Sequence, residues 1–506
     1  MDDINSLRQK CEDVGQGHLF QFWDQLDAEK QKILATDISL IDLQEAVGYF
    51  KEAEKTLNED CEKIDDHLEP LESDACGSVS QSSDELLDTY RSIGLTAVAN
   101  NEVAVMLLAG GQGTRLGVPY PKGMYDVGLP SRKTLYQIQA ERITKLERLA
   151  EKATGKPCAV PWYIMTSEHT KDATEDFFHK NEHFGLNKEN IMMFEQSMLP
   201  CFDFSGKIIL DSLHKISFAP AGNGGLYQAL RDESALADLI TRGVKYVHVY
   251  CVDNILVKMA DPVFIGFCVS KNIDCGAKVV EKAEPQEAVG VVCKVNGKHQ
   301  TVEYSEITLA TAEKRAADGK LLFSAGNICN HFFTVEFLKR VCLKENETQL
   351  KHHVAKKKIP YVDPSGQLHK PSSPNGIKME KFVFDVFQFA ENFAVWEVLR
   401  DDEFSPLKNA DGAPKDTPTT CRKALLNLHS RYVLSSGGKF VHADGTPYSN
   451  NCRQQNEDEA VVCEISPLVS YAGEGLEELN NKKFVPPVLI ELGSDSVSLV
   501  IKQGSS

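Results

Sequence analysis

The stretch from Val103 to Gly117 limits most strongly what this chain can fold into. It begins with six consecutive apolar residues, Val103 to Leu108, and runs directly into the sequence AGGQGTRLG. A short apolar run that ends in glycine predicts a strand buried on both faces, as in a parallel sheet. Glycines after such a strand let the backbone bend sharply and bring its N–H groups close to a ligand. The sequence therefore predicts an α/β sheet with a nucleotide-binding loop at this strand end.

The spacing of the loop differs from two common nucleotide-binding signatures. A Rossmann fingerprint has the pattern GxGxxG, and a Walker loop has GxxxxGK followed by Ser or Thr. Here Thr114 and Arg115 stand where the helix start or the lysine is required. Arg115 and the nearby Lys122 add fixed positive charge, and backbone donors with cations favour phosphate transfer. Loop composition alone also fits a plain turn after the strand.

Strand-like and helix-like segments alternate through the centre of the chain. A helical pattern covers residues 134–153. The strand candidates after the glycine loop are Trp162–Thr166, Ile191–Phe194 and Tyr246–Val252. This alternation predicts a mostly parallel sheet flanked by helices. The segments 275–281, 289–295 and 301–304 are instead predicted to be antiparallel strands of a lobe beside that sheet.

The two ends of the chain have different patterns, so we predict three domains. Residues 1–96 form an N-terminal helical domain, in which the acidic, serine-rich segment 59–83 is an exposed connector. Residues 97–410 form the central domain. Residues 411–506 form a small β-rich domain with Gly-Gly and Asp-Gly turn signals and a final alternating strand.

Composition limits the partners and the compartment. With 506 residues and a net charge of -18, the chain lacks the basic surface that non-specific nucleic-acid binding requires. No stretch is apolar enough for a membrane span, and the acidic start Met1-Asp2-Asp3 leads us to expect no signal peptide. The 14 cysteines form no CxxC pair, which indicates reduced thiols, mostly in the core, and a cytoplasmic protein. The cluster at His352-His353 with Lys356 to Lys358 is interpreted as a solvated patch.

The motif LAGGQGTRLG followed by PKGM resembles the signature of sugar nucleotidyltransferases, specifically the eukaryotic UDP-N-acetylhexosamine pyrophosphorylases. The resemblance extends from Leu19 to Ile490 and is dense between Val103 and Asn409. It implies a Rossmann-like nucleotidyltransferase sheet and in-line attack on the α-phosphate of UTP. The implied substrates are UTP and N-acetylglucosamine 1-phosphate, with N-acetylgalactosamine 1-phosphate as a further acceptor. The implied products are the UDP-sugar and pyrophosphate, and the implied assembly is a monomer or homodimer.

The resemblance also implies roles for residues in APAGNGG, VDN, VEYSEI, AGNICNHFF, NGIKMEKFVFD and FSPLKN. The implied catalytic residues are Arg115, Lys122 and Lys408. The implied nucleotide-binding residues are Leu108, Ala109, Gly110, Gly111, Lys122, Gln196, Gly222, Asp253 and Lys378. The implied sugar-binding residues are Asn223, Gly290, Glu303, Tyr304, Asn327, Phe382, Phe384 and Lys408. The chain departs from the family's PDGNGG in having Ala221.

The resemblance implies that Asp253 is the metal ligand. It follows a strand at the edge where open α/β sheets bind substrates, and its oxygens suit Mg²⁺, with Mn²⁺ as an alternative. A turn cap is the simpler interpretation from residue type alone. Likewise, Phe382 and Phe384 on their own are typical core residues. Two other functions stay open: a pyrophosphorylase for UDP-glucose or several UDP-sugars, and a non-catalytic paralogue that binds UDP-sugar.

Overall fold

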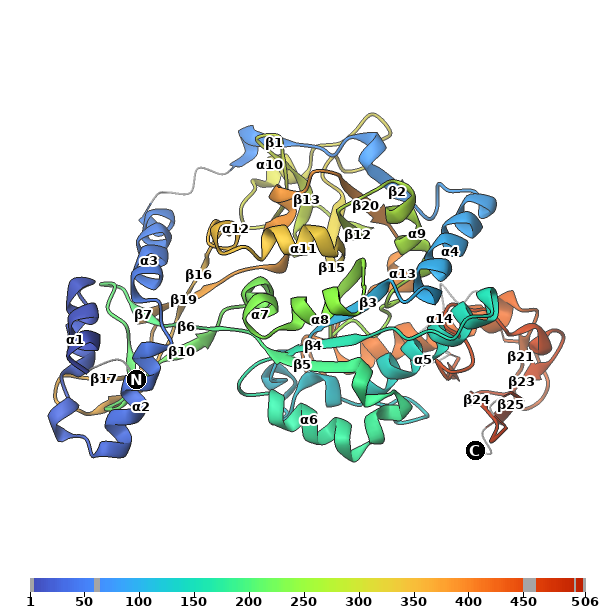
Figure 1. Ribbon diagram of the computed structural model, residues 1–506. Coiled ribbons are helices and arrows are strands. Elements are labelled where there is room, and N and C mark those ends of the chain that lie inside the picture. Colours follow the sequence, from blue (N-terminus) through green and yellow to red (C-terminus); the bar gives the residue numbers. More distant parts are fainter. Residues whose placement is uncertain (1–3, 59–63, 449–460, 496, 504–506) are drawn as a thin grey trace. The chain divides into compact units, whose positions relative to one another are not determined.

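The computed structural model describes residues 4–58, 64–448, 461–495 and 497–503 (Figure 1). The contacts divide the chain into two compact units, each built from three segments. Unit 1 comprises Met1–Asp66, Gln196–Asp232 and Val341–Val386. Unit 2 comprises His67–Glu195, Glu233–Arg340 and Phe387–Ser506. The domain boundaries expected after residues 96 and 410 stay a prediction.

A large sheet forms the centre of unit 2. Its strands in spatial order are β2 (Cys76–Ser78), β20 (Phe393–Glu397), β12 (Cys275–Glu281), β15 (Ala325–Thr334), β11 (Tyr246–Cys251), β3 (Val103–Leu108), β4 (Trp162–Thr166) and β5 (Ile191–Glu195). Neighbours along this path pair in parallel except at β15, which is antiparallel to both β11 and β12. The predicted mostly parallel α/β sheet is confirmed.

Two strands of this sheet differ from the prediction. Strand β12 was expected in an antiparallel lobe, yet its first six residues are buried and it pairs in parallel with β20. Burial on both faces is what places a strand inside a sheet. The rest of the expected lobe is an antiparallel hairpin of β13 (Val291–Val295) and β14 (Lys298–Val302), with β1 (Leu68–Glu69) beside β13.

Part of the segment interpreted as a connector is strand β2. Gly77 lies in the middle of β2, and a Cβ there would come within 2.6 Å of the Trp396 ring on β20. Only glycine lets the strand approach this ring, so Gly77, inside the segment expected to be a connector, is required for sheet packing.

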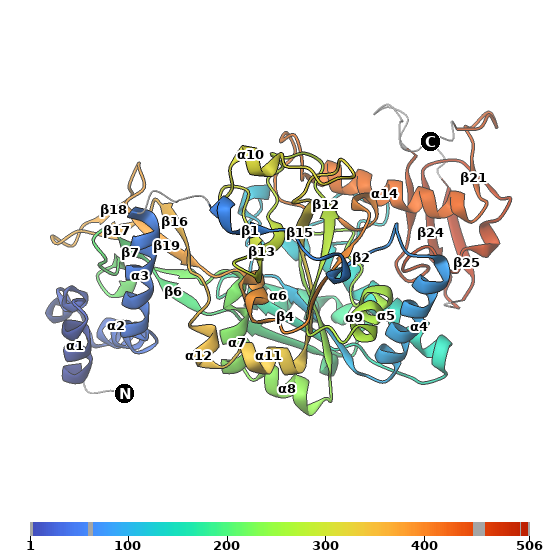
Figure 2. The same ribbon diagram turned by 90° about the horizontal axis from the view of Figure 1, so that it is seen from above.

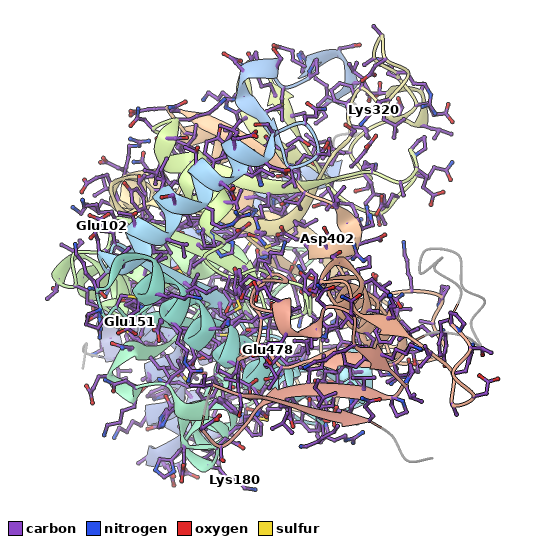
Figure 3. All side chains as sticks on the ribbon, turned by 90° about the vertical axis from the view of Figure 1, so that its right-hand side faces the viewer. Glu102, Glu151, Lys180, Lys320, Asp402 and Glu478 are labelled. Atoms are coloured by element: carbon purple, nitrogen blue, oxygen red, sulfur yellow. The ribbon has the colours of Figure 1, made fainter. Side chains whose placement is uncertain are left out.

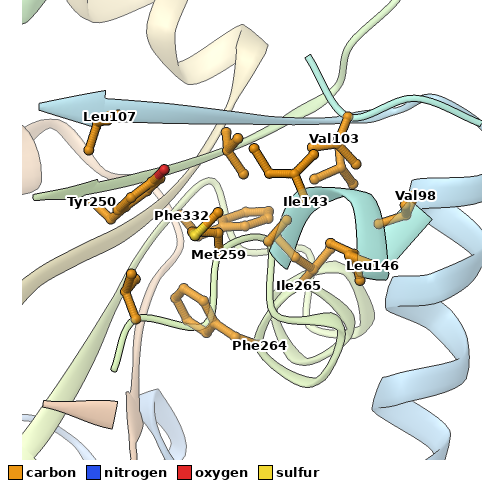
Figure 4. Close-up of a cluster of buried hydrophobic side chains, with 14 of the residues drawn as sticks. Val98, Val103, Leu107, Ile143, Leu146, Tyr250, Met259, Phe264, Ile265 and Phe332 are labelled. Atoms are coloured by element: carbon orange, nitrogen blue, oxygen red, sulfur yellow. The ribbon is translucent and has the colours of Figure 1, made fainter. Parts of the chain in front are cut away.

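Helices cover the central sheet through a shared apolar core. Three helices contribute to the apolar cluster that contains β3: α4 (Asp84–Ala99), α5 (Leu135–Thr154) and α9 (Pro262–Ser270). Figure 4 shows Val98 of α4, Ile143 of α5, Ile265 of α9 and Phe332 of β15 in one buried cluster. Gly266 lets α9 approach α4 closely, because a Cβ there would lie 1.8 Å from the Tyr90 carbonyl oxygen. The core therefore fixes β3, whose carboxyl end carries the glycine loop.

The C-terminal part of unit 2 is rich in short strands, as predicted. Helix α14 (Pro418–Ser435) precedes two small sheets. These are β21 (Lys439–Phe440) with β23 (Lys483–Phe484), and β22 (Cys463–Ile465) with β24 (Val488–Leu492) and β25 (Leu499–Gln503). Charged side chains of unit 2, such as Lys180 and Glu478, are exposed, and Figure 3 shows Lys180 at the lower edge of the view.

Unit 1 contains the predicted N-terminal helices, α1 (Ile4–Asp13), α2 (Ala28–Ser39) and α3 (Leu43–Asn58). Strands β7 (Phe202–Asp203), β19 (Gly376–Glu380) and β16 (His353–Lys357) form its main sheet, and α3 lies beside β16 (Figure 2). Two further strands, β6 (Met198–Pro200) and β10 (Phe218–Pro220), pair with each other. None of the helices in the described ranges is long and apolar enough to cross a membrane.

Candidate active site

Glycine conformation shapes the loop after β3. Gly113 has a φ of 69°, and a Cβ there would lie 2.8 Å from the Tyr120 carbonyl oxygen. An L side chain is therefore excluded by both backbone conformation and space. The N–H of Lys122 donates to the Gly111 carbonyl (3.2 Å), which closes the loop. This closure brings Arg115 and Lys122 back toward the end of β3, with Arg115 exposed.

The remaining loop residues follow directly from the strand. Leu108 and Ala109 are buried, the Ala109 N–H donates to the Met165 carbonyl on β4, and Gly110 accepts from Ser167 Oγ (3.2 Å). A Cβ on Gly111 would face open space. The backbone of this segment is thus fixed on the sheet side and open on the other.

Strands β3 and β11 end together, which brings Asp253 to the glycine loop. Leu108 and Cys251 are register partners, and the Val252 N–H donates to the Leu108 carbonyl (3.2 Å). Lys122 Nζ lies 3.7 Å from Asp253 Oδ2, and the two side chains are 18% and 19% exposed. A cation and a carboxylate therefore share a partly exposed position at the carboxyl edge of the sheet, where such sheets bind ligands.

The loop that carries Lys408 is attached to the same two elements. The Leu407 N–H donates to the Asp253 carbonyl (2.9 Å), and the Ala410 N–H donates to the Arg115 carbonyl (3.2 Å). The structure thus brings together the backbones of all four predicted phosphate-site residues of unit 2: Arg115, Lys122, Asp253 and Lys408.

Asn254 is a site residue that the sequence analysis missed. Its side chain is 4% exposed and joins the end of β11 to the Lys408 loop. Asn254 Nδ2 donates to the Glu403 carbonyl (2.7 Å), while Oδ1 accepts from the N–H groups of Ser405 (3.0 Å) and Leu256 (3.2 Å). Its place next to Asp253 was the available signal, because Glu403 and Ser405 lie 149 and 151 residues away.

A buried ion-pair cluster holds the start of the same loop. Lys278 is fully buried, with Nζ 2.6 Å from Asp261 Oδ2 and a second ion pair to Glu403. Lys258 Nζ lies 3.3 Å from Glu403 Oε1. Burial by itself raises the pKa of Asp261, but the two lysines outweigh it, so the pKa lies below its ordinary value. Glu403 ends α13 (Arg400–Glu403), so the cluster fixes the residue just before the Lys408 loop.

The predicted sugar-binding residues of unit 2 gather around β13, β14 and β15. A Cβ on Gly290 would lie 3.1 Å from Glu303 Oε1, and the Gly290 carbonyl accepts from the Asn327 N–H (2.8 Å). Asn327 Nδ2 lies 3.5 Å from Thr301 Oγ1. Tyr304 is 50% exposed. Gly290, Glu303 and Asn327 are therefore close together, with Tyr304 facing solvent.

In unit 1, the loop Ala221–Gly224 is hydrogen-bonded to the segment after β19. Gly222 has a φ of 83°, and the Gly224 N–H donates to the Lys381 carbonyl (2.8 Å). Asn223 Oδ1 accepts from the Val383 N–H (3.0 Å). These bonds bring Gly222 and Asn223 beside the chain that leads to Phe382 and Phe384.

Ala221, the departure from the family motif, is buried next to Ser197. The Ala221 N–H donates to the Ser197 carbonyl (3.0 Å). Ser197 Oγ is buried and has no hydrogen-bond partner in the described part of the chain. The backbone contacts of the loop are thus retained, while Ala221 offers this hydroxyl no partner. Gln196, which precedes Ser197, is 7% exposed.

Phe382 and Phe384 lie with their ring centroids 5.1 Å apart. Phe382 is half-buried and stacks on His353, and His353 Nε2 lies 3.0 Å from Asp385 Oδ1. The interpretation of this cluster as a solvated patch holds for Lys356 to Lys358, which are exposed. It fails for the two histidines, because His352 stacks on Tyr49 and His353 stacks on Phe382. Lys378 lies in β19 and is half-buried.

The donor set around Asp253 fits an ion shared with substrate. The described residues contain no group of three His, Cys, Asp or Glu side chains that could hold a metal ion. Asp253 is a single, partly exposed carboxylate beside a lysine. Mg²⁺ is commonly bound by one or two carboxylates together with waters and substrate phosphates, so this arrangement is compatible with it.

Comparison with known proteins identifies the family. The model of the UTP–glucose-1-phosphate uridylyltransferase family matches residues 47–450. The chain belongs to this family. A relative from Xenopus tropicalis, "UDP-N-acetylhexosamine pyrophosphorylase-like protein 1", is 55% identical over 96% of this chain and 95% of its own length. The "UDP-N-acetylglucosamine pyrophosphorylase" of Saccharomyces cerevisiae is 41% identical over 95% of this chain and 98% of its own length.

A solved structure agrees with this assignment. The uridine diphosphate N-acetylglucosamine pyrophosphorylase of Trypanosoma brucei, crystallised with an inhibitor, superposes with a TM-score of 0.79. It is 30% identical in sequence, and the match covers 94% of this chain and 95% of that chain. The expected nucleotidyltransferase fold and family are confirmed.

Proposed function

We propose that this chain is a uridylyltransferase that makes UDP-N-acetylglucosamine and pyrophosphate from UTP and N-acetylglucosamine 1-phosphate. N-acetylgalactosamine 1-phosphate is a second acceptor. The observation that carries the proposal is the meeting of Lys122, Asp253 and the Lys408 loop at the carboxyl ends of β3 and β11. This edge combines a glycine loop, two lysines and one carboxylate, as phosphate transfer requires.

The chemistry needs positioning and charge neutralisation. An oxygen of the sugar phosphate bonds to the α-phosphorus of UTP while the bond to pyrophosphate breaks in line. No covalent protein nucleophile is needed, because the attacking oxygen is already anionic. In this proposal Leu108 to Gly111 hold the nucleotide, Arg115 and Lys122 neutralise its phosphates, and Lys408 contacts the sugar phosphate. Lysine suits this role as a compact charge.

Mg²⁺ is the proposed cofactor, with Mn²⁺ as an alternative. Asp253 would hold the ion, which would supply further positive charge at the UTP phosphates. Lys122 Nζ, 3.7 Å from Asp253 Oδ2, would add a second positive charge at the same phosphates. Asp253→Asn keeps the size of the side chain but removes its charge, so we expect turnover to collapse while the fold survives. Full activity of this variant, or of EDTA-treated wild type, would contradict the metal role.

The N-acetyl group is proposed as the feature that selects the sugar. Support comes from the apolar rings of Phe382 and Phe384, which lie together beside the loop that carries Asn223. The names of the relatives from Xenopus and yeast agree with this choice. The family model itself is named for glucose 1-phosphate, so a broader specificity is the alternative to test.

One assay separates the candidate functions. Pyrophosphate release is measured from UTP and Mg²⁺ with the 1-phosphates of N-acetylglucosamine, N-acetylgalactosamine and glucose. We expect turnover with the two N-acetylated sugars and little with glucose. Equal turnover with glucose would indicate a broad UDP-sugar pyrophosphorylase. Binding of UDP-N-acetylglucosamine without turnover of any sugar would indicate a non-catalytic paralogue.

The proposed setting is the cytoplasm, and the proposed assembly is a monomer or homodimer. The compartment is supported by the cysteines, because none of the twelve described ones forms a disulfide. Sedimentation analysis of the purified chain, with and without UTP, tests the assembly.

A further inference from the structure

Two cysteines face each other at the carboxyl end of β11. The Sγ atoms of Cys251 and Cys329 are 3.1 Å apart, and Cys251 donates its S–H to Cys329. The antiparallel register of β11 and β15 runs to Tyr250 opposite Asn330, so Cys251 and Cys329 oppose each other at the next step. Opposed residues of antiparallel strands have Cα atoms ~4.5–5.5 Å apart, within the ~4.4–6.8 Å that a disulfide spans. The Cα spacing of this pair therefore suits a disulfide, and the sulfurs must still close from 3.1 Å to form it.

A distortion of β15 directs Cys329 toward its partner. Cys329 has a φ of 51°, a left-handed conformation that is uncommon for any residue except glycine. The pairing of β12 with β15 shifts at this point, because Ala277 faces His331 whereas Val279 faces Asn327. Such a bulge re-aims a side chain, and bulges occur often beside active sites. The Cys329 N–H donates to Asn327 Oδ1 (3.0 Å), which supports the distorted conformation.

Both thiols differ from most of the other described cysteines in exposure. Cys251 and Cys329 are partly exposed, whereas eight of the twelve described cysteines are buried. In the contact between them, Cys251 donates its S–H and Cys329 accepts with a sulfur lone pair.

A bond between the two sulfurs would move the predicted site. Asp253 lies two residues after Cys251, and Asn327 lies two residues before Cys329. A disulfide needs an S–S distance of ~2.05 Å, so the sulfurs must approach by roughly 1 Å. A misplacement of about 1 Å can cost on the order of 100-fold in rate at a site that works by positioning.

We propose that Cys251 and Cys329 form a redox modification site: a peroxide converts them to a disulfide, and the disulfide suppresses uridylyl transfer by displacing Asp253 and Asn327. The regulatory half of this proposal rests on the proposed function. Cys329 Sγ attacks one peroxide oxygen, which breaks the O–O bond and gives a sulfenic acid and one water. Cys251 Sγ then displaces the hydroxyl as a second water and forms the S–S bond. The two thiols lose two electrons and two protons, and hydrogen peroxide is reduced to two waters.

The test combines a chemical readout with a kinetic one. Fully reduced wild type, Cys329→Ala, Cys251→Ala and the matched control Cys76→Ala are treated with hydrogen peroxide, which is then removed. Cys76 is an exposed cysteine outside this pair. Peptide mass mapping without reduction detects a link between the peptides of Cys251 and Cys329. Pyrophosphate release and calorimetric titration with UTP and Mg²⁺ are measured before oxidation, after oxidation and after dithiothreitol.

We expect the linked peptide in wild type and Cys76→Ala, together with a fall in turnover of about tenfold or more that dithiothreitol reverses. Cys329→Ala and Cys251→Ala should keep their turnover through the treatment. Absence of the linked peptide would overturn the modification site. A linked peptide with unchanged turnover and unchanged UTP binding would overturn its effect. A third outcome separates the thiol site from the proposed function. If wild type forms the link and its UTP binding changes on oxidation, but it releases no pyrophosphate even when reduced, the thiol site is supported and the proposed function is contradicted.

Discussion

Asn254 offers a test of how the Lys408 loop is positioned. Asn254→Ala removes three hydrogen bonds and leaves the Glu403 carbonyl and the N–H groups of Ser405 and Leu256 without their partner. Each unsatisfied buried group costs ~1–3 kcal/mol, and entering water offsets part of this cost. We expect the loop to shift, with a loss in kcat on the order of 100-fold. Asn254→Asp turns an oxygen toward the Glu403 carbonyl but keeps the two acceptor bonds. Its loss in kcat should therefore be smaller than that of Asn254→Ala.

Steady-state pyrophosphate release at varied sugar 1-phosphate and varied UTP measures this effect. Because Lys408 is assigned to the sugar phosphate, kcat should fall and KM for the sugar 1-phosphate should rise, while calorimetric UTP affinity stays near that of wild type. Asn392→Ala is a matched control. The Asn392 side chain likewise bonds backbone groups, donating to the carbonyls of Lys271 and Asn272, but it lies before β20, at the opposite edge of the sheet. Wild-type kinetics in Asn254→Ala, or an equal loss in UTP affinity, would refute the positioning role.

Three further predictions concern the sugar, the cations and pH. Phe382→Ala should weaken use of N-acetylated sugars by ~1–3 kcal/mol and change glucose 1-phosphate turnover less; equal losses in kcat/KM would contradict the acetamido role. Arg115→Ala should lower kcat by roughly 10²–10³ with little change in UTP affinity. Lys408→Ala should lower kcat and also raise KM for the sugar 1-phosphate. Calorimetric titration with UTP tests these separate roles, and loss of UTP binding in Lys408→Ala would refute the assignment of Lys408 to the sugar phosphate. Burial lowers the pKa of His248 to about 4, below its unfolded value of ~6.5. The contribution of the neutral ring to stability is therefore complete above pH ~6.5. It is lost by ~1.4 kcal/mol per pH unit as the pH falls from there toward 4. Thermal unfolding at pH 7.5 and 5.5 should therefore show a flatter pH dependence for His248→Gln than for wild type, and equal shifts would contradict the assignment.

The sequence predicted best what depends on neighbouring residues. Strand β3 and its glycine loop were recognisable because the apolar run and the glycines are adjacent in the chain. The place of β12 was not predicted, because its partners β15 and β20 are remote in sequence. Asn254 and Lys278 are ordinary polar residues whose roles depend on contacts with Glu403. The thiol pair was hidden for the same reason, since 78 residues separate its members.

The assembly of unit 1 from three separate segments has a consequence for how the protein is made. Its core joins Leu7 and Phe50 from the N-terminal helices to Phe202, and then to Ile377 and Met379 on β19. A ribosome must therefore add more than 300 residues after Phe50 before this core is complete. During that interval the apolar faces of α1 to α3 lack their final partners, and such surfaces favour association with other chains. Newborn chains that stop before β19 should thus associate with chaperones more than full-length chains do.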